Sequence, residues 1–162
     1  MNTAFSNDDT SAPGEQGSGQ LIYLAEDDHD DIFLFERALK ALKSGHSLNT
    51  FENGQQLFDA LQKPGAKVPD IVFLDINMPV QTGLECLLNI RRHHSKVLPV
   101  FLFSTAQDRL TVEQARKLGA TGYLSKPTST EELGALLTSV LAIDWRSRSV
   151  NDFYVHLQLA ST

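Results

Sequence analysis

The chain has 162 residues, a formal net charge of −6 and a single cysteine. This length suggests one domain with tails, and the acidic balance weighs against a generalised nucleic-acid-binding surface. One cysteine excludes a disulfide within the chain and fits a reducing compartment. No apolar run approaches the roughly 20 residues that span a bilayer, and the N-terminus does not look like a secretory signal. We therefore expect a cytoplasmic protein that contacts neither membrane nor nucleic acid.

Residues 1–19 are predicted to form a disordered tail. In the segment 2–20, Phe5 is the only large apolar side chain among mostly Asn, Asp, Ser, Gly, Gln and Thr. Such a composition cannot bury enough apolar surface to offset the entropy cost of ordering. The folded domain is expected at 20–143, followed by a C-terminal tail over 144–162.

Within this domain, short apolar runs alternate with stretches whose apolar residues have helical spacing. We expect strands at 21–25, 48–51, 71–74, 98–103 and 122–124. We expect helices at 30–43, 53–62, 84–92 and 108–118, and a last helix that Thr128 and Glu131 cap and that runs to 143. Continuous apolar strands separated by helices indicate a parallel α/β sheet covered on both faces. Short right-handed crossovers favour a flavodoxin-like doubly wound (βα)5 fold with five strands in the order 2-1-3-4-5.

Polar side chains follow four of these strands, and the carboxyl ends of strands in such a sheet share one rim where functional sites lie. Adjacent carboxylates are costly unless a cation neutralises them, and hard oxygen ligands suit Mg²⁺. A lysine opposite would hold a phosphoryl oxygen, and a carboxylate can form an aspartyl phosphate when metal and lysine share the charge. The constellation predicts a phosphoryl site made of Glu26, Asp27, Asp28, Asp75, Ser104, Thr105 and Lys126.

Four stretches carry a family resemblance: LIYLAEDD, VFLDINMPVQTGLE, PVFLFSTA and GATGYLSKP. Each stands at the end of an expected strand, and the four occur in the right order. Over 20–143 the chain resembles a response-regulator receiver domain of two-component signalling, of the stand-alone type. The tail 144–162 is too short for a helix-turn-helix output module.

The resemblance implies a phosphorylation-dependent switch within a phosphorelay. Asp75 would accept a phosphoryl group from a sensor histidine kinase or a histidine phosphotransfer protein. Mg²⁺, with Mn²⁺ as a substitute, would bind Glu26, Asp27, Asp75 and the backbone carbonyl of Asn77. The protein would catalyse only its own phosphorylation and dephosphorylation, so we do not expect an enzyme that turns over a diffusible substrate.

Further roles follow from the same resemblance. Lys126, Ser104 and Thr105 would bind the phosphoryl oxygens, and Ser104 and Tyr123 would form the switch pair. Structural roles fall to Pro79 and Gly83 in the loop after Asp75, and to Pro127 after a cis peptide bond. The signal would reach an unknown downstream protein, or a second copy of the chain, through the fourth helix, fifth strand and fifth helix or through the C-terminal arm.

The sequence departs from the family pattern in places. Glu26 replaces the commoner Asp, and Asp28 leaves open an alternative acidic pair of Asp27 and Asp28. Thr105 stands where a smaller residue is usual, and Ala106 lacks a polar side chain near the path of an attacking water. These departures bear on the lifetime of the phosphorylated state.

Ordinary roles remain open for single residues. Asp75 could cap a loop, Glu26 and Asp27 could cap the first helix, Lys126 could be a surface lysine and Tyr123 a residue at the core edge. We interpret His93 and His94 as a solvated helix end and Cys86 as a packed thiol.

The alternating apolar residues 153, 155, 157 and 159 predict a strand. This strand would add to a sheet edge or pair with another protomer; the alternative is a tail that packs on its own domain or is partly disordered.

Three other functions fit the chain less well. A binding scaffold that works without phosphorylation commonly lacks part of the acidic pair or the lysine, and this chain has both. A phosphohydrolase of this kind needs a second Asp two positions after the nucleophile, where Asn77 stands. An FMN carrier needs a phosphate-binding loop after the first strand, where the acidic residues 26–28 would repel phosphate.

Overall fold

The computed structural model describes residues 19–149 and 151–158. The predicted disordered tail lies almost entirely outside these residues, as does Leu159. Strands and helices alternate along the chain. The elements are β1 (Leu21–Ala25), α1 (His29–Ala41), β2 (Ser47–Phe51), α2 (Gly54–Gln62), β3 (Ile71–Leu74), α3 (Gly83–His93), β4 (Val100–Ser104), α4 (Arg109–Lys117), β5 (Gly122–Ser125), α5 (Thr130–Leu141) and β6 (Tyr154–His156).

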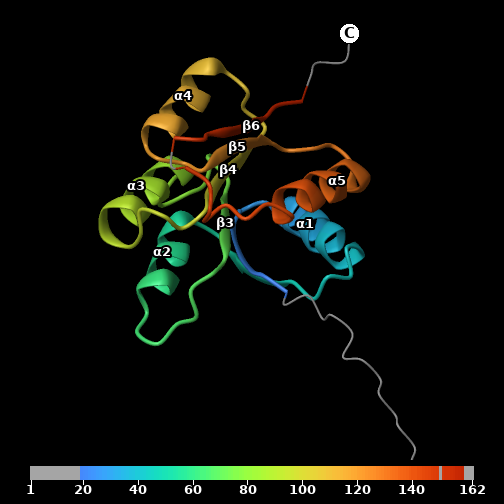
Figure 1. The fold of residues 1–162 in the computed structure, drawn as a ribbon, viewed down its shortest axis with the longest axis horizontal. Coiled ribbons are helices and arrows are strands. Elements are labelled where there is room, and N and C mark those ends of the chain that lie inside the picture. The colour runs from blue at the N-terminus through green and yellow to red at the C-terminus, as the bar shows by residue number, and fades with distance from the viewer. Residues whose placement is uncertain (1–18, 150, 159–162) are drawn as a thin grey trace, which may run out of the picture.

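The strands form one parallel sheet in the order β2-β1-β3-β4-β5-β6. The flavodoxin-like architecture and the order of the first five strands are as expected. The expected number of strands is wrong, because β6 from the C-terminal tail extends the sheet beyond β5 (Figure 1).

Helices cover both faces of the sheet, with α1 and α5 on one side and α2, α3 and α4 on the other (Figure 1). Phe35 of α1 and Leu136 of α5 belong to one core, while Leu57 of α2 and Leu87 of α3 belong to the other. The central strands β1, β3, β4 and β5 are buried along their whole length. Continuous apolar strands are expected when both faces of a parallel sheet are covered.

Two predicted boundaries need correction. The N-cap of α5 is Ser129, not Thr128, because Ser129 has extended backbone angles and its hydroxyl accepts a hydrogen bond from the N–H of Glu132. Strand β4 begins at Val100 rather than at residue 98, since the intervening Pro99 has no N–H to donate to a ladder.

The tail is fixed to the sheet through an aromatic cluster. The Trp145 indole N–H donates to the carbonyl of Val140 at 2.8 Å, and the Trp145 ring lies 4.8 Å from Phe101 and 5.4 Å from Tyr154, measured between centroids. A Cβ at Gly122 would lie 2.4 Å from the Tyr154 carbonyl oxygen, so glycine at this position allows β6 to approach β5. Nowhere in the described parts of the chain is a helix long and apolar enough to cross a membrane.

Candidate functional site

The site lies at the rim formed by the carboxyl ends of the strands. The backbone N–H of Asp75 donates to the carbonyl of Ala25 at 3.0 Å, and that of Lys126 donates to the carbonyl of Ser104 at 2.9 Å. The N–H of Glu26 donates to the carbonyl of Phe51 at 2.9 Å. Each charged side chain therefore starts from a backbone position that a neighbouring strand holds in register.

Three carboxylates meet at this rim. Glu26, Asp27 and Asp75 each offer an oxygen within 4.8 Å of the other two. Glu26 and Asp75 are buried, whereas Asp27 is exposed. Closely spaced carboxylate oxygens are the hard ligands that Mg²⁺ prefers and that Mn²⁺ also accepts. These three residues therefore fit a divalent cation. Because Asp27 is exposed, the cation can reach the site from solvent.

Burial makes the ionised forms of these carboxylates costly. It raises the pKa of Glu26 from 4.5 to about 7, although Lys126 opposes the shift. Burial likewise raises the pKa of Asp75, with the positive charge of Lys126 acting in the opposite direction. A bound cation would favour both ionised forms. It would therefore stabilise this buried site more than it would stabilise an exposed acidic cluster.

Lys126 is the cationic partner of the site. Its Nζ lies 2.5 Å from Glu26 Oε2, 2.8 Å from Asp31 Oδ2 and 3.4 Å from Asp75 Oδ1. Burial by itself lowers the pKa of Lys126, but the hydrogen bonds with Asp31 and Glu26 and the charge of Asp75 raise it above its usual value. Lys126 is thus a fully charged ammonium surrounded by three carboxylates.

Sequence reasoning missed Asp31. It lies in the first turn of α1, and its Oδ2 accepts a hydrogen bond from Lys126 Nζ across 95 residues of sequence. The signal that could have found it is the start of α1 one residue after the acidic pair, which brings a first-turn carboxylate back toward the rim.

Asp28 has a different role from its neighbours. Its Oδ1 accepts hydrogen bonds from the backbone N–H groups of Asp30 at 2.8 Å and Asp31 at 3.1 Å, so Asp28 is the N-cap of α1. The cluster of close carboxylate oxygens includes Glu26 and Asp27 but not Asp28. This division of roles favours Glu26–Asp27 over Asp27–Asp28 as the acidic pair.

The loop after β3 turns tightly beneath Asp75. The N–H of Gln81 donates to the carbonyl of Pro79 at 2.7 Å, and the intervening Val80 has φ 65°. A Cβ at Gly83 would lie 2.1 Å from the Asp75 carbonyl oxygen, so only glycine fits there. Asn77 is exposed on this loop, two residues after Asp75.

The predicted switch residues are buried beside each other. Ser104 is buried at the end of β4, and its hydroxyl accepts a hydrogen bond from the N–H of Ala106 at 3.2 Å. The Tyr123 hydroxyl donates to the Ala106 carbonyl at 2.6 Å, and the ring is fully buried. Thr105, the next residue after Ser104, is exposed. The ring of Tyr123 is therefore directed inward, and burial raises the pKa of its hydroxyl.

The expected cis bond before Pro127 is wrong. The Lys126–Pro127 bond is trans, as are the other peptide bonds of the described residues. Trans is the commoner form of an X–Pro bond. Lys126 contacts its carboxylate partners in this geometry.

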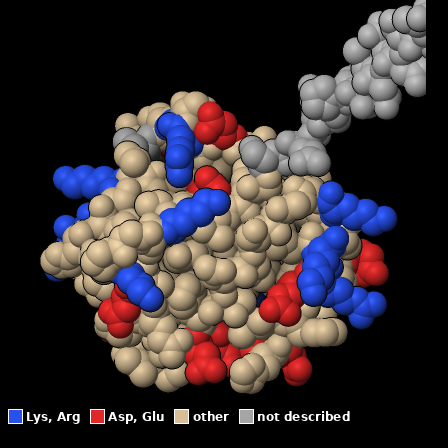
Figure 2. Space-filling model, turned by 90° about the horizontal axis from the view of Figure 1, so that it is seen from below, with Lys and Arg blue, Asp and Glu red and all other residues tan. Residues whose placement is uncertain are grey.

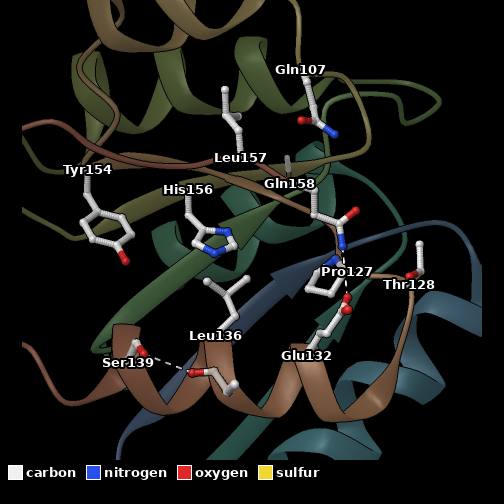
Figure 3. Close-up of a pocket in the computed structure, with 11 residues that line it drawn as sticks. Gln107, Pro127, Thr128, Glu132, Leu136, Ser139, Tyr154, His156, Leu157 and Gln158 are labelled. Atoms are coloured by element: carbon white, nitrogen blue, oxygen red, sulfur yellow. Dashed lines mark hydrogen bonds between the residues drawn. The ribbon is translucent and has the colours of Figure 1, made fainter. Parts of the chain in front are cut away.

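A groove of about 900 Å³ lies between β6 and α5, beside the acidic rim. Figure 3 shows Tyr154 and His156 directed from β6 toward Leu136 and Ser139 of α5. Pro127 also lines the groove, so one end of it adjoins the rim. Gln158 Nε2 donates to Glu132 Oε2 at 3.1 Å and closes part of this end.

Three other residues singled out by the sequence lie apart from the rim. Cys86 is buried against the Gly54 carbonyl, at 3.3 Å from Sγ, and burial raises the pKa of its thiol to about 12. This thiol is unreactive at neutral pH. His93 is exposed in the last turn of α3, and His94 follows as the C-cap.

The face in Figure 2 shows no extended basic patch, whereas several Asp and Glu side chains lie along its lower edge. Lys and Arg side chains are scattered toward its edges, with Asp and Glu among them and a broad uncharged area between. This face therefore lacks the clustered basic residues that bind nucleic acid.

The chain is similar to proteins of one known family. A family model described as "Response regulator receiver domain" matches residues 22–138. The DNA-binding transcriptional regulator NtrC of Escherichia coli (strain K12) is 33% identical over 122 residues, which make up 75% of this chain and 25% of NtrC. The chain thus spans about a quarter of the length of the NtrC proteins that it matches.

Two solved structures resemble the whole domain. The phosphorylated cyanobacterial phytochrome response regulator RcpA is 26% identical, with a TM-score of 0.71 over 80% of this chain and 96% of RcpA. The chemotaxis response regulator CheY4 of Vibrio cholerae is 25% identical, with a TM-score of 0.66 over 76% of this chain and 99% of CheY4.

Proposed function

Because this chain belongs to the response regulator receiver domain family, we propose that it is a switch in a phosphorelay, operated by phosphorylation of Asp75. The donor is a phosphohistidine on a sensor histidine kinase or a histidine phosphotransfer protein, and the reaction depends on Mg²⁺. One observation carries the proposal: the oxygens of Glu26, Asp27 and Asp75 lie within 4.8 Å of one another, and Lys126 Nζ is 3.4 Å from Asp75. RcpA, a similar protein, is known in a phosphorylated form.

The chemistry needs a nucleophile and charge compensation. One carboxylate oxygen of Asp75 attacks phosphorus, so an O–P bond forms while the P–N bond breaks and the imidazole leaves with its electron pair. Glu26, Asp27, Asp75 and the carbonyl of Asn77 would hold Mg²⁺, which supplies positive charge against the phosphoryl oxygens. The ammonium of Lys126 and the hydroxyls of Ser104 and Thr105 would bind those oxygens.

The switch would work through Ser104 and Tyr123. If the Ser104 hydroxyl moves to the phosphoryl group, it leaves the N–H of Ala106 to which it is now bonded at 3.2 Å. The Tyr123 hydroxyl is bonded to the same residue at 2.6 Å. A shift of Ala106 would therefore also move Tyr123 and change the neighbouring surface of α4, β5 and α5.

The output partner binds this surface in our proposal, and β6 is part of it because β6 pairs with β5. The partner is a downstream protein or a second copy of the chain. The protein acts in the cytoplasm and has no catalytic activity beyond its own phosphorylation and dephosphorylation. NtrC is a DNA-binding regulator by name, but our proposal for this chain includes no contact with nucleic acid.

The test is direct phosphorylation. The protein is incubated with Mg²⁺ and acetyl phosphate, and its intact mass is measured, with Asp75→Asn as the variant that lacks the acceptor. We expect one phosphoryl group on the parent protein and none on the variant. An exposed aspartate such as Asp59 provides the matched control, since Asp59→Asn should leave the mass shift intact. Absence of an adduct on the parent protein, together with failure to bind beryllofluoride, would disprove the proposed function.

A further inference from the structure

We infer that Asp31 is a positioning residue that anchors the ammonium of Lys126 in the resting protein and competes with the phosphoryl group for it. The inference rests on the proposed function, because the competition matters only if Asp75 is phosphorylated. It concerns a side chain in the first turn of α1 that none of the four sequence stretches of the family resemblance contains.

Distances show where the ammonium rests. Lys126 Nζ lies 2.8 Å from Asp31 Oδ2, which is a hydrogen bond, but 3.4 Å from Asp75 Oδ1. A charge-assisted N–H···O bond is typically about 2.7–2.9 Å long. The Glu26 carboxylate is nearer still, with Oε2 at 2.5 Å from Nζ. The resting ammonium is therefore held by Glu26 and Asp31, and Asp75 is the most distant of its three carboxylate partners.

Asp31 and Glu26 differ as anchors. Glu26 is 1% exposed and belongs to the cluster of carboxylates that fits a metal, so bound Mg²⁺ would draw its charge away from Lys126. The Asp31 side chain is 35% exposed and does not belong to that cluster. Asp31 thus remains an anion facing Lys126 when the metal site is filled.

Exposure also makes the Asp31 contact reversible. Water can solvate the Asp31 carboxylate once Lys126 leaves, whereas a buried carboxylate would lose its only compensation. Asp31 has no competing duty as a helix cap, since Asp28 is the N-cap of α1. Asp31 shares with Asp30 the favourable position of an anion in the first turn of a helix, but only Asp31 contacts Lys126.

Binding of beryllofluoride in the presence of Mg²⁺ tests the competition by calorimetry. Asp31→Ala removes the rival anion, so we expect about two- to tenfold tighter binding, in keeping with a partly exposed charge-assisted contact. Asp31→Glu restores a carboxylate and should return the affinity toward that of the parent protein. Asp30→Ala is the matched control, because Asp30 lies in the same first turn but is exposed and is not a partner of Lys126.

A second measurement detects the contact between Lys126 and Asp31 without metal or phosphoryl mimic. The ammonium protons of Lys126, observed by nitrogen–proton NMR at low temperature, should exchange faster with water in Asp31→Ala than in the parent protein or in Asp30→Ala. This readout also separates a specific contact from a general gain of positive charge.

Two outcomes overturn the inference. Weaker beryllofluoride binding by Asp31→Ala would mean that Asp31 directs Lys126 toward the phosphoryl group, and an equal gain in Asp30→Ala would mean that only net charge matters. If the parent protein does not bind beryllofluoride at all, the proposed function fails, and the anchoring of Lys126 is then decided by the NMR signal alone.

Discussion

The carboxyl rim and the β5–β6 edge adjoin each other but are built in opposite ways. The rim brings Glu26, Asp75 and Lys126 together out of solvent, so its energy depends on which groups are charged. The edge is held by backbone pairing and by the ring of Trp145. We therefore expect the stability of the rim to depend on the ionic state of its side chains, and the stability of the edge to depend on steric fit.

Lys126→Met should cause the largest change, because it leaves two buried carboxylates without their cation. We expect the free energy of unfolding of the metal-free protein at pH 8 to fall by about 3 kcal/mol, as for other broken buried ion pairs. Chemical denaturation measures this value. Lys63→Met, at an exposed position after α2, is the control and should change it little. A loss no greater than that of the control would show that the rim does not depend on charge.

The pH dependence of stability should show the same property. The pKa of Glu26 is about 7 in the folded protein against 4.5 as its ordinary value. Between these values the folded state binds more protons than the unfolded state, so the free energy of unfolding should fall as pH rises through this window, by up to roughly 3 kcal/mol.

Denaturation of the metal-free protein at pH 4.5 and at pH 7.5 checks this pH effect. Glu26→Gln should flatten the curve, and Mg²⁺ should restore stability mainly at the higher pH. Stability that instead rises over this range in the parent protein, and is unaffected by Glu26→Gln, would contradict the raised pKa.

Gly122→Ala tests the edge by steric means. The new Cβ would meet the Tyr154 carbonyl oxygen at 2.4 Å and the Phe101 ring at 2.7 Å, so β6 has to move away. We expect a loss of about 1–2 kcal/mol, smaller than at the rim because a short strand can detach. Hydrogen exchange of the amides of residues 154–156 should accelerate, with β1 and β3 unchanged. Retention of their protection would rule out the tight approach of β6 to β5.

Gly134→Ala should have the smallest effect and the opposite sign. A Cβ at Gly134 has open space on α5, which lines the groove beside β6. Alanine is favoured over glycine inside a helix by about 0.5–1 kcal/mol, so the melting temperature should rise slightly. This variant also serves as the control for Gly122→Ala. A lower melting temperature would indicate that α5 needs flexibility at this point.

The sequence was sufficient to predict the site residues that lie at the ends of strands. Asp75 directly follows β3 and Lys126 directly follows β5. Parallel strands bring such positions to one rim whatever the loops do. Asp31 could not be found in this way because its direction depends on where α1 begins and how it crosses the sheet. The helix cap at Ser129 was missed by one position, since Thr128 and Ser129 are chemically equivalent caps and only backbone angles separate them.

The C-terminal tail shows another limit of prediction from the sequence. Alternation of Phe153, Val155 and Leu157 predicts a strand but contains no information about the edge that it joins. That choice depends on the shape of the β5 edge, where Gly122 leaves room, and on the distant contact between Trp145 and Phe101.

Because β6 runs parallel to β5, the chain leaves the sheet on the same side as Lys126. Leu157 and Gln158 lie beside the loop that begins at Pro127, and Gln158 touches the first turn of α5. A spectroscopic label on Gln158 would therefore lie next to the loop that follows Lys126. Under the proposed function, a label at this position would report on phosphorylation of Asp75.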